Sequence, residues 1–500
     1  MSDNFQLPSA PIEQFTLDNG LRVVMNPDSA VPVIAVAVYY NAGSRNEKPG
    51  RTGFAHLFEH MMFQGSENLP KGAHFQHIFN NGGTMNGTTS SERTNYFQTL
   101  PANQLPLALW LESDRMRSLK VTQENLDNQR EAVKEEKRLR IDNQPYVTAF
   151  LRMDELIFKN PANAHSTIGS MEDLDAATVE DVREFFRIYY APNNAVLTIA
   201  GDFDTAEARK LVEQYFATIP RQPDPPVVDV SEPEDVAGHE DTFQDQFAPL
   251  AAFLVGWKIP ARRTPQFFAL SLATDLLFNG DSSRLYQKLV KGDESVVSFN
   301  GGIDERRGPS AISLFVTPKP ARDAAQIRQA IMSEIKRLAT EGPSAEEMLK
   351  LRNSLLNDAA RGRQVSLYRA QRLSEFALYD NDPNLFNTEL DSYLSVTAEQ
   401  IKEAVARYMD TDNHAALDII PAASSTGLAP AATAQASGDA RQPAAPPPQL
   451  PQKPSTLEPA TSDDQPATPL EPAAPRPEQP EQPTDPPGQN EPGAMKPLRP

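Results

Sequence analysis

One short stretch of the chain carries three side chains that could do chemistry together: His56, Glu59 and His60. The other residues from 53 to 63 are mainly apolar, which predicts a largely buried helix. Residues four apart lie one turn apart on the same helix face, so the rings of His56 and His60 can converge on one cation. A buried carboxylate without compensation costs several kcal/mol, so Glu59 argues against a chance pair of histidines. The stretch therefore predicts two ligands of a zinc site with an acid beside them.

A catalytic zinc site usually has three protein ligands and a water, so a third ligand must come from another element. The chain has no cysteine, which leaves His, Asp and Glu. The best candidates are Glu131, Glu135 and Glu136, in a highly charged predicted helix. Ala132 and Val133 indicate its buried face, and Glu136 falls one turn beyond them. Reasoning from these residues alone leaves all three acids open.

Glu59 is predicted to be the general base rather than a ligand, because one helical step places its carboxylate beside the zinc-bound water. Removing a proton from that water and later passing it to a leaving amine is the chemistry of amide hydrolysis. The remaining histidines show no comparable pattern. They are expected to be structural: His74, His77, His165, His239 and His414.

The bulk composition excludes several classes of partner. A net charge of -20 and a pI near 4.9 argue against binding to nucleic acid or to an anionic membrane surface. No apolar run approaches the roughly 20 residues that a membrane span requires. The first residues lack the features of a signal peptide, so we expect a cytoplasmic protein, or a periplasmic one if a leader was trimmed.

Strand and helix patterns alternate along the first two fifths of the chain. An Asn-Gly turn separates two short strand patterns, and a polar, Thr-rich strand pair follows the His-containing helix. Predicted strands are Phe15–Val24 (a turned pair), Val31–Tyr40, Met85–Thr89, Arg93–Leu100 and Ala195–Gly201, with helices from Leu105 to about Arg140, over Tyr146–Phe158 and after Thr178.

The second part of the chain repeats the first. The segment from Thr178 to Asn194 matches that from Thr397 to Asn413 at a constant offset of 219, including the helix-capping signal at its start. A strand and a helix also precede each copy in the same order. In the second copy the positions that pair with His56, Glu59 and His60 are Ser271, Thr274 and Asp275.

The repeat predicts an α+β fold with two homologous domains, each a mainly antiparallel sheet packed with helices. We expect a zinc-binding domain over residues 10–222, a Pro-rich and acidic linker over 223–243, and a homologous domain without zinc over 244–421. Residues 422–500 are rich in Pro, Ala, Gln and acids, with no aromatic residue, which predicts a disordered tail. Its proline runs could instead dock on a partner as polyproline II.

His56-Leu57-Phe58-Glu59-His60 is the inverted zincin signature, and the chain resembles the family of pitrilysin, insulin-degrading enzyme and mitochondrial processing peptidase. The resemblance covers about residues 15–421 and is carried by several further motifs. These are Phe15–Leu21, Asn86–Thr89 with Thr94–Phe97, Ile168–Ser170 with Asp173-Leu174, and Tyr190–Asn194.

The resemblance implies that Glu136 is the third ligand, since a glutamate about 76 residues beyond the second motif His completes the family's metal site. It implies one Zn²⁺ per chain. A second family acid often stands seven residues before that ligand, where this chain has Gln129. It also implies that peptides add as a strand to a sheet edge beside the zinc, at the backbone of Asn86, Gly87 and Thr88.

The family's substrate-holding Arg and Tyr, seven residues apart, fall on Val290 and Val297 in this chain. Arg361 and Tyr368 have the spacing but not the location. We therefore expect the catalytic subunit of a heterodimer whose homologous partner supplies that pair, the two enclosing short or unfolded peptides. A homodimer is the alternative assembly. The alternative function is a non-catalytic structural subunit of a processing-peptidase-like complex.

Overall fold

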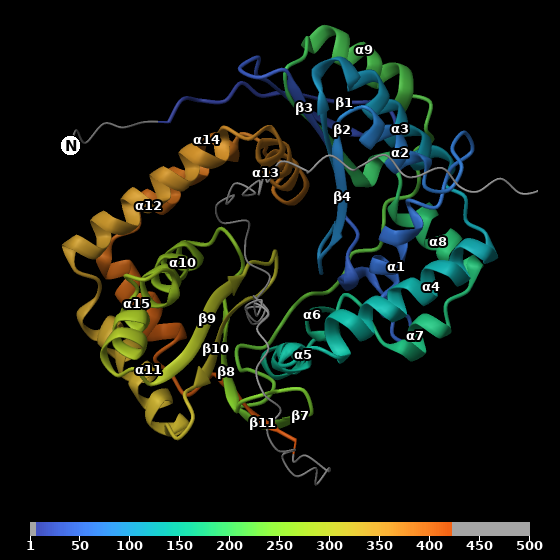
Figure 1. The fold of residues 1–500 in the computed structure, drawn as a ribbon. Helices are drawn as coiled ribbons and strands as arrows, with labels where there is room; N and C mark the ends of the chain where they lie inside the picture. The colour runs from blue at the N-terminus through green and yellow to red at the C-terminus, as the bar shows by residue number, and fades with distance from the viewer. Residues whose placement is uncertain (1–6, 423–500) are drawn as a thin grey trace, which may run out of the picture. The chain divides into compact units, whose positions relative to one another are not determined.

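The computed structural model describes residues 7–422, and the predicted tail lies outside this range (Figure 1). Strands of the first half form a six-stranded sheet in the order β1-β2-β6-β3-β5-β4. Neighbours pair antiparallel, except β2 with β6. The strands are β1 Glu13–Thr16, β2 Arg22–Pro27, β3 Val33–Tyr40, β4 Thr84–Thr89, β5 Thr94–Pro101 and β6 Ala195–Gly201.

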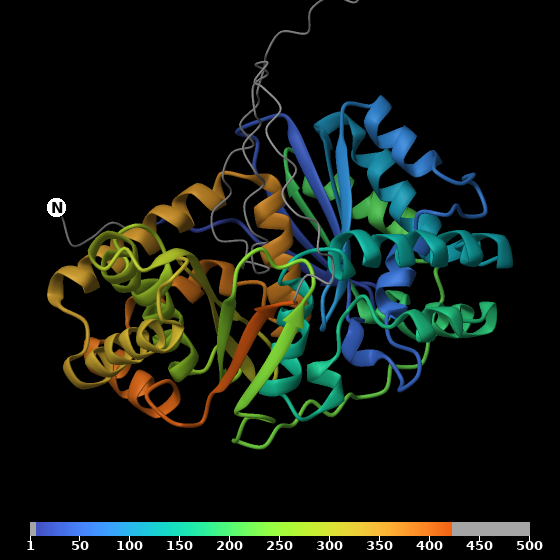
Figure 2. The same cartoon turned by 60° about the horizontal axis from the view of Figure 1, so that its bottom comes forward.

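Strands of the second half form a five-stranded sheet in the order β7-β11-β8-β10-β9. Its single parallel pair, β7 with β11, is visible side by side in Figure 2. Matching β2-β6-β3-β5-β4 to β7-β11-β8-β10-β9 preserves every pairing and direction. The strands are β7 Glu240–Asp245, β8 Ala252–Ile259, β9 Val296–Asp304, β10 Ser310–Pro318 and β11 Ala415–Pro421. The predicted α+β fold with two homologous halves is confirmed.

The first half contains α1 Phe54–Met61, α2 Ala73–Asn80, α3 Leu105–Ser118, α4 Gln123–Lys137, α5 Val147–Ile157, α6 Pro161–Ala164, α7 Met171–Asp175, α8 Val179–Tyr189 and α9 Thr205–Phe216. The second contains α10 Pro265–Phe278, α11 Ala324–Glu341, α12 Ala345–Arg363, α13 Ser366–Tyr379, α14 Leu385–Leu394 and α15 Ala398–Tyr408. Short turns of 3-10 helix occupy Ser44–Asn46, Ala102–Gln104 and Pro192–Asn194, and π-helix occupies Arg138–Asp142 and Tyr286–Gly292. None of the helices in residues 7–422 combines the length and apolarity that a bilayer crossing requires.

The repeated capping signal begins equivalent helices. Thr178 accepts from the N–H of Asp181 at the start of α8, and Thr397 accepts from that of Gln400 at the start of α15. Helix α8 leads into β6, which pairs parallel with β2, and α15 leads into β11, which pairs parallel with β7. The sequence repeat therefore marks one structural unit used twice.

Each sheet is covered on one face by a helix from the other half. Helix α13 packs Leu373, Phe376 and Ala377 against Val24, Ala37 and other residues of β2, β3 and β6. Helix α5 packs against the second sheet in the same way, with Met153 and Ile157 beside Leu254. The hydrophobic cores therefore cross between the two halves, a feature that the residue patterns did not reveal.

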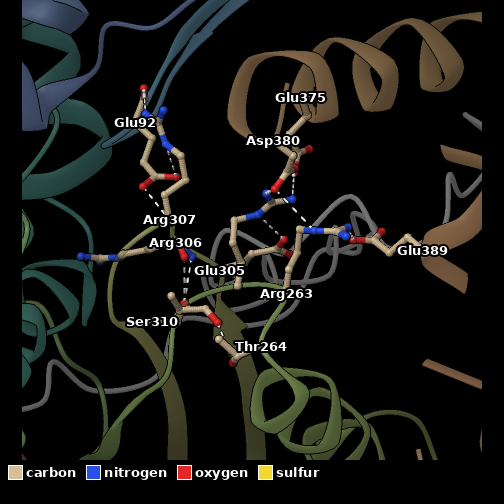
Figure 3. A network of polar contacts seen from close by, with 12 residues as sticks. Glu92, Arg263, Thr264, Glu305, Arg306, Arg307, Ser310, Glu375, Asp380 and Glu389 are labelled. Atoms are coloured by element: carbon tan, nitrogen blue, oxygen red, sulfur yellow. Dashed lines mark hydrogen bonds and ion pairs between the residues drawn. The ribbon is translucent and has the colours of Figure 1, made fainter. Parts of the chain in front are cut away.

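Two hairpin turns also connect the halves through polar contacts (Figure 3). The backbone N–H of Arg307, between β9 and β10, donates to Oε1 of Glu92, between β4 and β5, at 2.9 Å. Glu92 also pairs with the buried Arg45. Nearby, Arg262 makes two hydrogen bonds of 2.7 and 2.6 Å to Asp380, at the end of α13. The exchanged helix is thus anchored by charge as well as by its apolar face.

The segment between the halves, residues 220–239, forms no helix and no strand. Strand β7 begins at Glu240, within the linker predicted for residues 223–243, because its residues pair with β11. The segment before it is nevertheless held in place. Glu232 accepts hydrogen bonds from the backbone N–H groups of Lys159 and Asn160, both at 2.9 Å, and its buried carboxylate pairs with Lys258 at 3.2 Å.

We expect Phe376→Ala to lower the free energy of unfolding by about 3–5 kcal/mol, because it removes a buried ring from the contact between α13 and the first sheet. The matched control is Phe79→Ala, whose ring is 55% exposed and should change stability by less than about 0.5 kcal/mol. Denaturant unfolding of both variants measures the difference. Equal stability of the two would contradict the packing of α13.

Candidate metal centre

Helix α1 carries the three residues of the motif. Its apolar residues Phe54, Leu57 and Phe58 are buried in the first core, while His56 and His60 share the opposite face. The helix starts at Gly53, which has a φ of 85°, and a Cβ there would lie 2.5 Å from the carbonyl oxygen of Ile168. Only glycine fits this start without displacing backbone.

The structure brings Glu136, on α4, to the two histidines of α1. Its Oε2 lies 3.2 Å from Nε2 of His60 and 3.7 Å from Nε2 of His56. One donor atom from each residue falls within 4.8 Å of the others, and within residues 7–422 this is the one such trio of His, Asp or Glu. By contrast Glu131 and Glu135 point to exposed ion pairs with Lys134 and Arg138.

The three side chains fit a zinc ion. Two imidazoles and a carboxylate are a common ligand set of catalytic zinc, and bonds of 2.0–2.1 Å imply donor separations of about 3.3 Å. The buried Nδ1 of His56 has no hydrogen-bond partner among the described residues. Its Nε2, at 3.7 Å from Glu136, is too distant for a hydrogen bond. A metal ion between the three side chains would give Nε2 a partner.

The protonation states of His56 and Glu136 also favour the binding of a cation. Burial, and then the neighbouring His60, lower the pKa of His56 to about 4, so its ring is neutral at pH 7. The hydrogen bond with His60 lowers the pKa of Glu136, which is therefore ionised. A neutral imidazole and a carboxylate are the forms that bind metal.

Glu59 lies beside the trio and is not one of its members. Its Oε2 accepts a hydrogen bond from Oγ1 of Thr89 on β4, at 2.5 Å. Burial raises the pKa of Glu59, although the Thr89 hydroxyl opposes this. A raised pKa strengthens a carboxylate as a base near neutral pH.

Strand β4 forms the edge of the first sheet next to Glu59. A Cβ on Gly87 would lie 3.2 Å from Oε1 of Glu59, so the glycine keeps the backbone close to the acid. The N–H of Gly87 donates to Oδ1 of Asn86 at 2.9 Å, and Arg93 donates to the carbonyl of Thr88. Asn86, Gly87 and Thr88 thus lie at an outer strand edge beside the base.

The sequence analysis did not assign two residues that contact the site, Thr89 and Arg140. Thr89, which bonds to Glu59, directly follows Asn86-Gly87-Thr88, and strand alternation could have singled it out. Arg140 lies four residues after Glu136 and pairs with its second oxygen at 3.0 Å. The i,i+4 spacing could have predicted this ion pair from the sequence.

Among the described residues, the second half holds no equivalent trio. Gly65 and Gly280, both with positive φ, follow α1 and α10 at the offset that pairs His56 with Ser271 and Glu59 with Thr274. Thr274 is buried and donates to the carbonyl of Leu270.

The two valines at the positions of the family's Arg and Tyr lie in different surroundings. Val290 packs against the second core, and Val297 is exposed on β9. Gln129 is buried on α4 and bonds to Asn128, outside the trio.

Comparison with known proteins identifies the family. Residues 22–167 match the family described as "Insulinase (Peptidase family M16)", and residues 176–355 match "Peptidase M16 inactive domain". Zinc protease PqqE of Helicobacter pylori is 31% identical over 281 residues, 56% of this chain and 63% of that protein, so the match spans less than two thirds of its length. An uncharacterized zinc protease of Mycobacterium leprae is 27% identical over 423 residues, 84% of this chain and 94% of that one.

A probable mitochondrial-processing peptidase subunit beta of Arabidopsis thaliana is 24% identical over 366 residues, 71% of this chain and 68% of that one. Among solved structures, a protease from Helicobacter pylori superposes with a TM-score of 0.79 at 24% identity, covering 83% of this chain and 100% of that one. Pitrilysin gives a TM-score of 0.69 at 20% identity, covering 83% and 45%. These likenesses concern the fold.

The fold defines the class of protein: it consists of two domains of the insulinase type. In this chain the histidine pair of the described trio lies in the first domain. The chain belongs to peptidase family M16, and its relatives include proteins named zinc proteases. The family resemblance predicted from the motifs is confirmed.

We expect Glu136→Gln to weaken zinc binding by at least about 100-fold, since even indirect partners of metal ligands are worth 10–100-fold. Glu135→Gln, one position earlier on α4, should leave binding unchanged because its side chain faces solvent. Metal analysis after dialysis against a chelator compares the two. Equal zinc contents would contradict the assignment of Glu136.

Proposed function

We propose that the chain is the zinc-bearing catalytic subunit of an endopeptidase. One observation carries the proposal: His56, His60 and Glu136 converge within 4.8 Å, and Glu59, on the same short helix as the two histidines, places its carboxylate beside them. A chain that served only as a structural subunit would have no use for a buried acid next to such a trio.

His56, His60 and Glu136 would hold the ion. Zinc, when bound, supplies a Lewis acid that acidifies water and polarises a carbonyl. Glu59 takes the proton from the attacking water and delivers it to the leaving amine. The hydroxyl of Thr89 fixes Oε2 of Glu59, which orients the other oxygen, Oε1, toward Gly87.

The peptide would bind along the outer edge of β4. An added strand uses backbone hydrogen bonds, which requires an extended or unfolded substrate and little side-chain selectivity. Gly87 lets that backbone come close to Glu59. Because Asn86 occupies the N–H of Gly87, its side chain has to release this donor when a peptide binds.

A homologous partner would complete the site. Val290 and Val297 provide no group that could hold a peptide by charge or hydrogen bond. The relatives include proteins named as a subunit, the beta subunit of a mitochondrial-processing peptidase. We therefore propose a heterodimer whose second chain carries the Arg and Tyr, with a homodimer as the alternative.

We expect Glu59→Gln to keep its zinc and to lose about 10²- to 10⁴-fold in kcat, the usual contribution of a general base. The amide keeps the size of the side chain but cannot take a proton. Zinc content and cleavage of an unfolded peptide are measured on the same sample. Turnover like that of the unchanged chain would refute the proposed base.

We expect the purified chain alone to bind zinc and cleave peptides poorly, because the substrate-holding pair is missing. Adding a homologous chain that carries the Arg and Tyr should raise kcat/KM. Peptide cleavage across a titration of the second chain tests this. Strong activity in a homogeneous sample of the single chain would overturn the need for a partner.

A further inference from the structure

The start of the metal-binding helix is capped by a side chain from the segment just before it, outside the helix itself. Gly53 has no side chain with which to cap α1. Instead Glu47, whose side chain is fully buried, accepts the N–H of Gly53 at 3.0 Å and that of Ala55 at 2.8 Å. These are two of the N–H groups that every helix start leaves unpaired. Ala55 directly precedes His56, so the cap acts on the turn that carries this ligand.

His165 holds Glu47 in turn. Its Nε2 lies 2.9 Å from Oε2 of Glu47, and its Nδ1 lies 2.6 Å from the carbonyl of Pro161. A carbonyl oxygen only accepts hydrogen bonds, so Nδ1 of His165 carries a hydrogen. The contact between Nε2 and the carboxylate of Glu47 must then share a proton. Burial raises the pKa of Glu47; burial lowers that of His165, but the hydrogen bond to Glu47 raises it overall.

The turn that carries His165 is fixed from the second half. Nη1 of the buried Arg306, between β9 and β10, donates to the carbonyl of Asn163 at 2.7 Å. The amide of Asn163 donates to Glu232 at 2.9 Å. His165 is therefore held on both sides of the imidazole and through its neighbouring backbone.

We infer that Glu47 and His165 are positioning residues of the metal site. Glu47 holds the first turn of α1 so that His56 faces Glu136, and His165 orients Glu47. Because His56 lies in the first turn and His60 in the last, losing the cap displaces one ligand relative to the others. The inference rests on the proposed zinc site. It adds two positioning residues that are not themselves metal ligands.

The test measures Zn²⁺ affinity of the full chain by competition with a chelator, together with the midpoint of thermal unfolding. We expect Glu47→Gln and His165→Ala to bind Zn²⁺ about 10–100-fold more weakly. His165→Gln, which keeps an N–H donor for Glu47, should recover part of this loss. The matched control is Glu347→Gln, which removes a carboxylate that also holds a helix start, that of α12, and pairs with Arg284. It should lower the unfolding midpoint and leave Zn²⁺ affinity unchanged.

Undiminished affinity in both Glu47→Gln and His165→Ala would overturn the inference and leave the proposed function intact. An equal loss of affinity in Glu347→Gln would overturn it too, since general destabilisation would then explain the effect. If the unchanged chain binds Zn²⁺ no better than His56→Ala, the proposed function itself fails.

A measurement on the unchanged chain covers the case in which the variants do not fold. We expect the amide hydrogen of Ala55 to be protected from exchange in the zinc-free chain, because Glu47 accepts it. Rapid exchange of this amide would show that the cap is not formed and would overturn the inference.

Discussion

The crossing of α1 and α4 is the contact on which the candidate site depends. One helix supplies two histidines, and the carboxylate that completes the trio comes from a helix about seventy residues later, so only their packing sets the 3.2 and 3.7 Å separations. Helix α1 has eight residues, too few to be stable alone. Its direction is set by neighbours: Phe58 packs against Phe185 and Tyr190 on one side, and Glu47 caps its start.

Up to residue 422, where the described chain ends, the second half has no metal trio, yet it contributes to the first half. Helix α13 covers one face of the first sheet, and Arg306 and Arg307 contact the segments that hold His165 and Glu92. A duplicated unit that keeps its packing surfaces while losing its ligands can support the unit that retains them. Exchange of α5 and α13 makes this support reciprocal, because each sheet leaves an apolar face that its own half does not cover.

Sequence reasoning succeeded where the signal is local. Strand and helix patterns, the Asn-Gly turn and the two capping boxes at Thr178 and Thr397 all depend on residues within a few positions of one another. The same holds for the repeat, whose two copies have the same sheet topology. The exchange of α5 and α13 could not be inferred, since an amphipathic helix does not record which sheet its apolar face will meet.

The sequence by itself determined the motif His56, Glu59 and His60 and its loss in the second half, because residue type and helical spacing suffice for both. The family followed from the resemblance of several motifs to known proteins. Without the family resemblance, the sequence could not show which of Glu131, Glu135 and Glu136 is the third metal ligand. It also gave no sign that His165 contacts Glu47. The tertiary structure decided both, since Glu136 is the acid that reaches the histidines and His165 meets Glu47 across 118 residues of chain. Contacts between distant segments depend on how helices and sheets pack, which residue spacing does not encode.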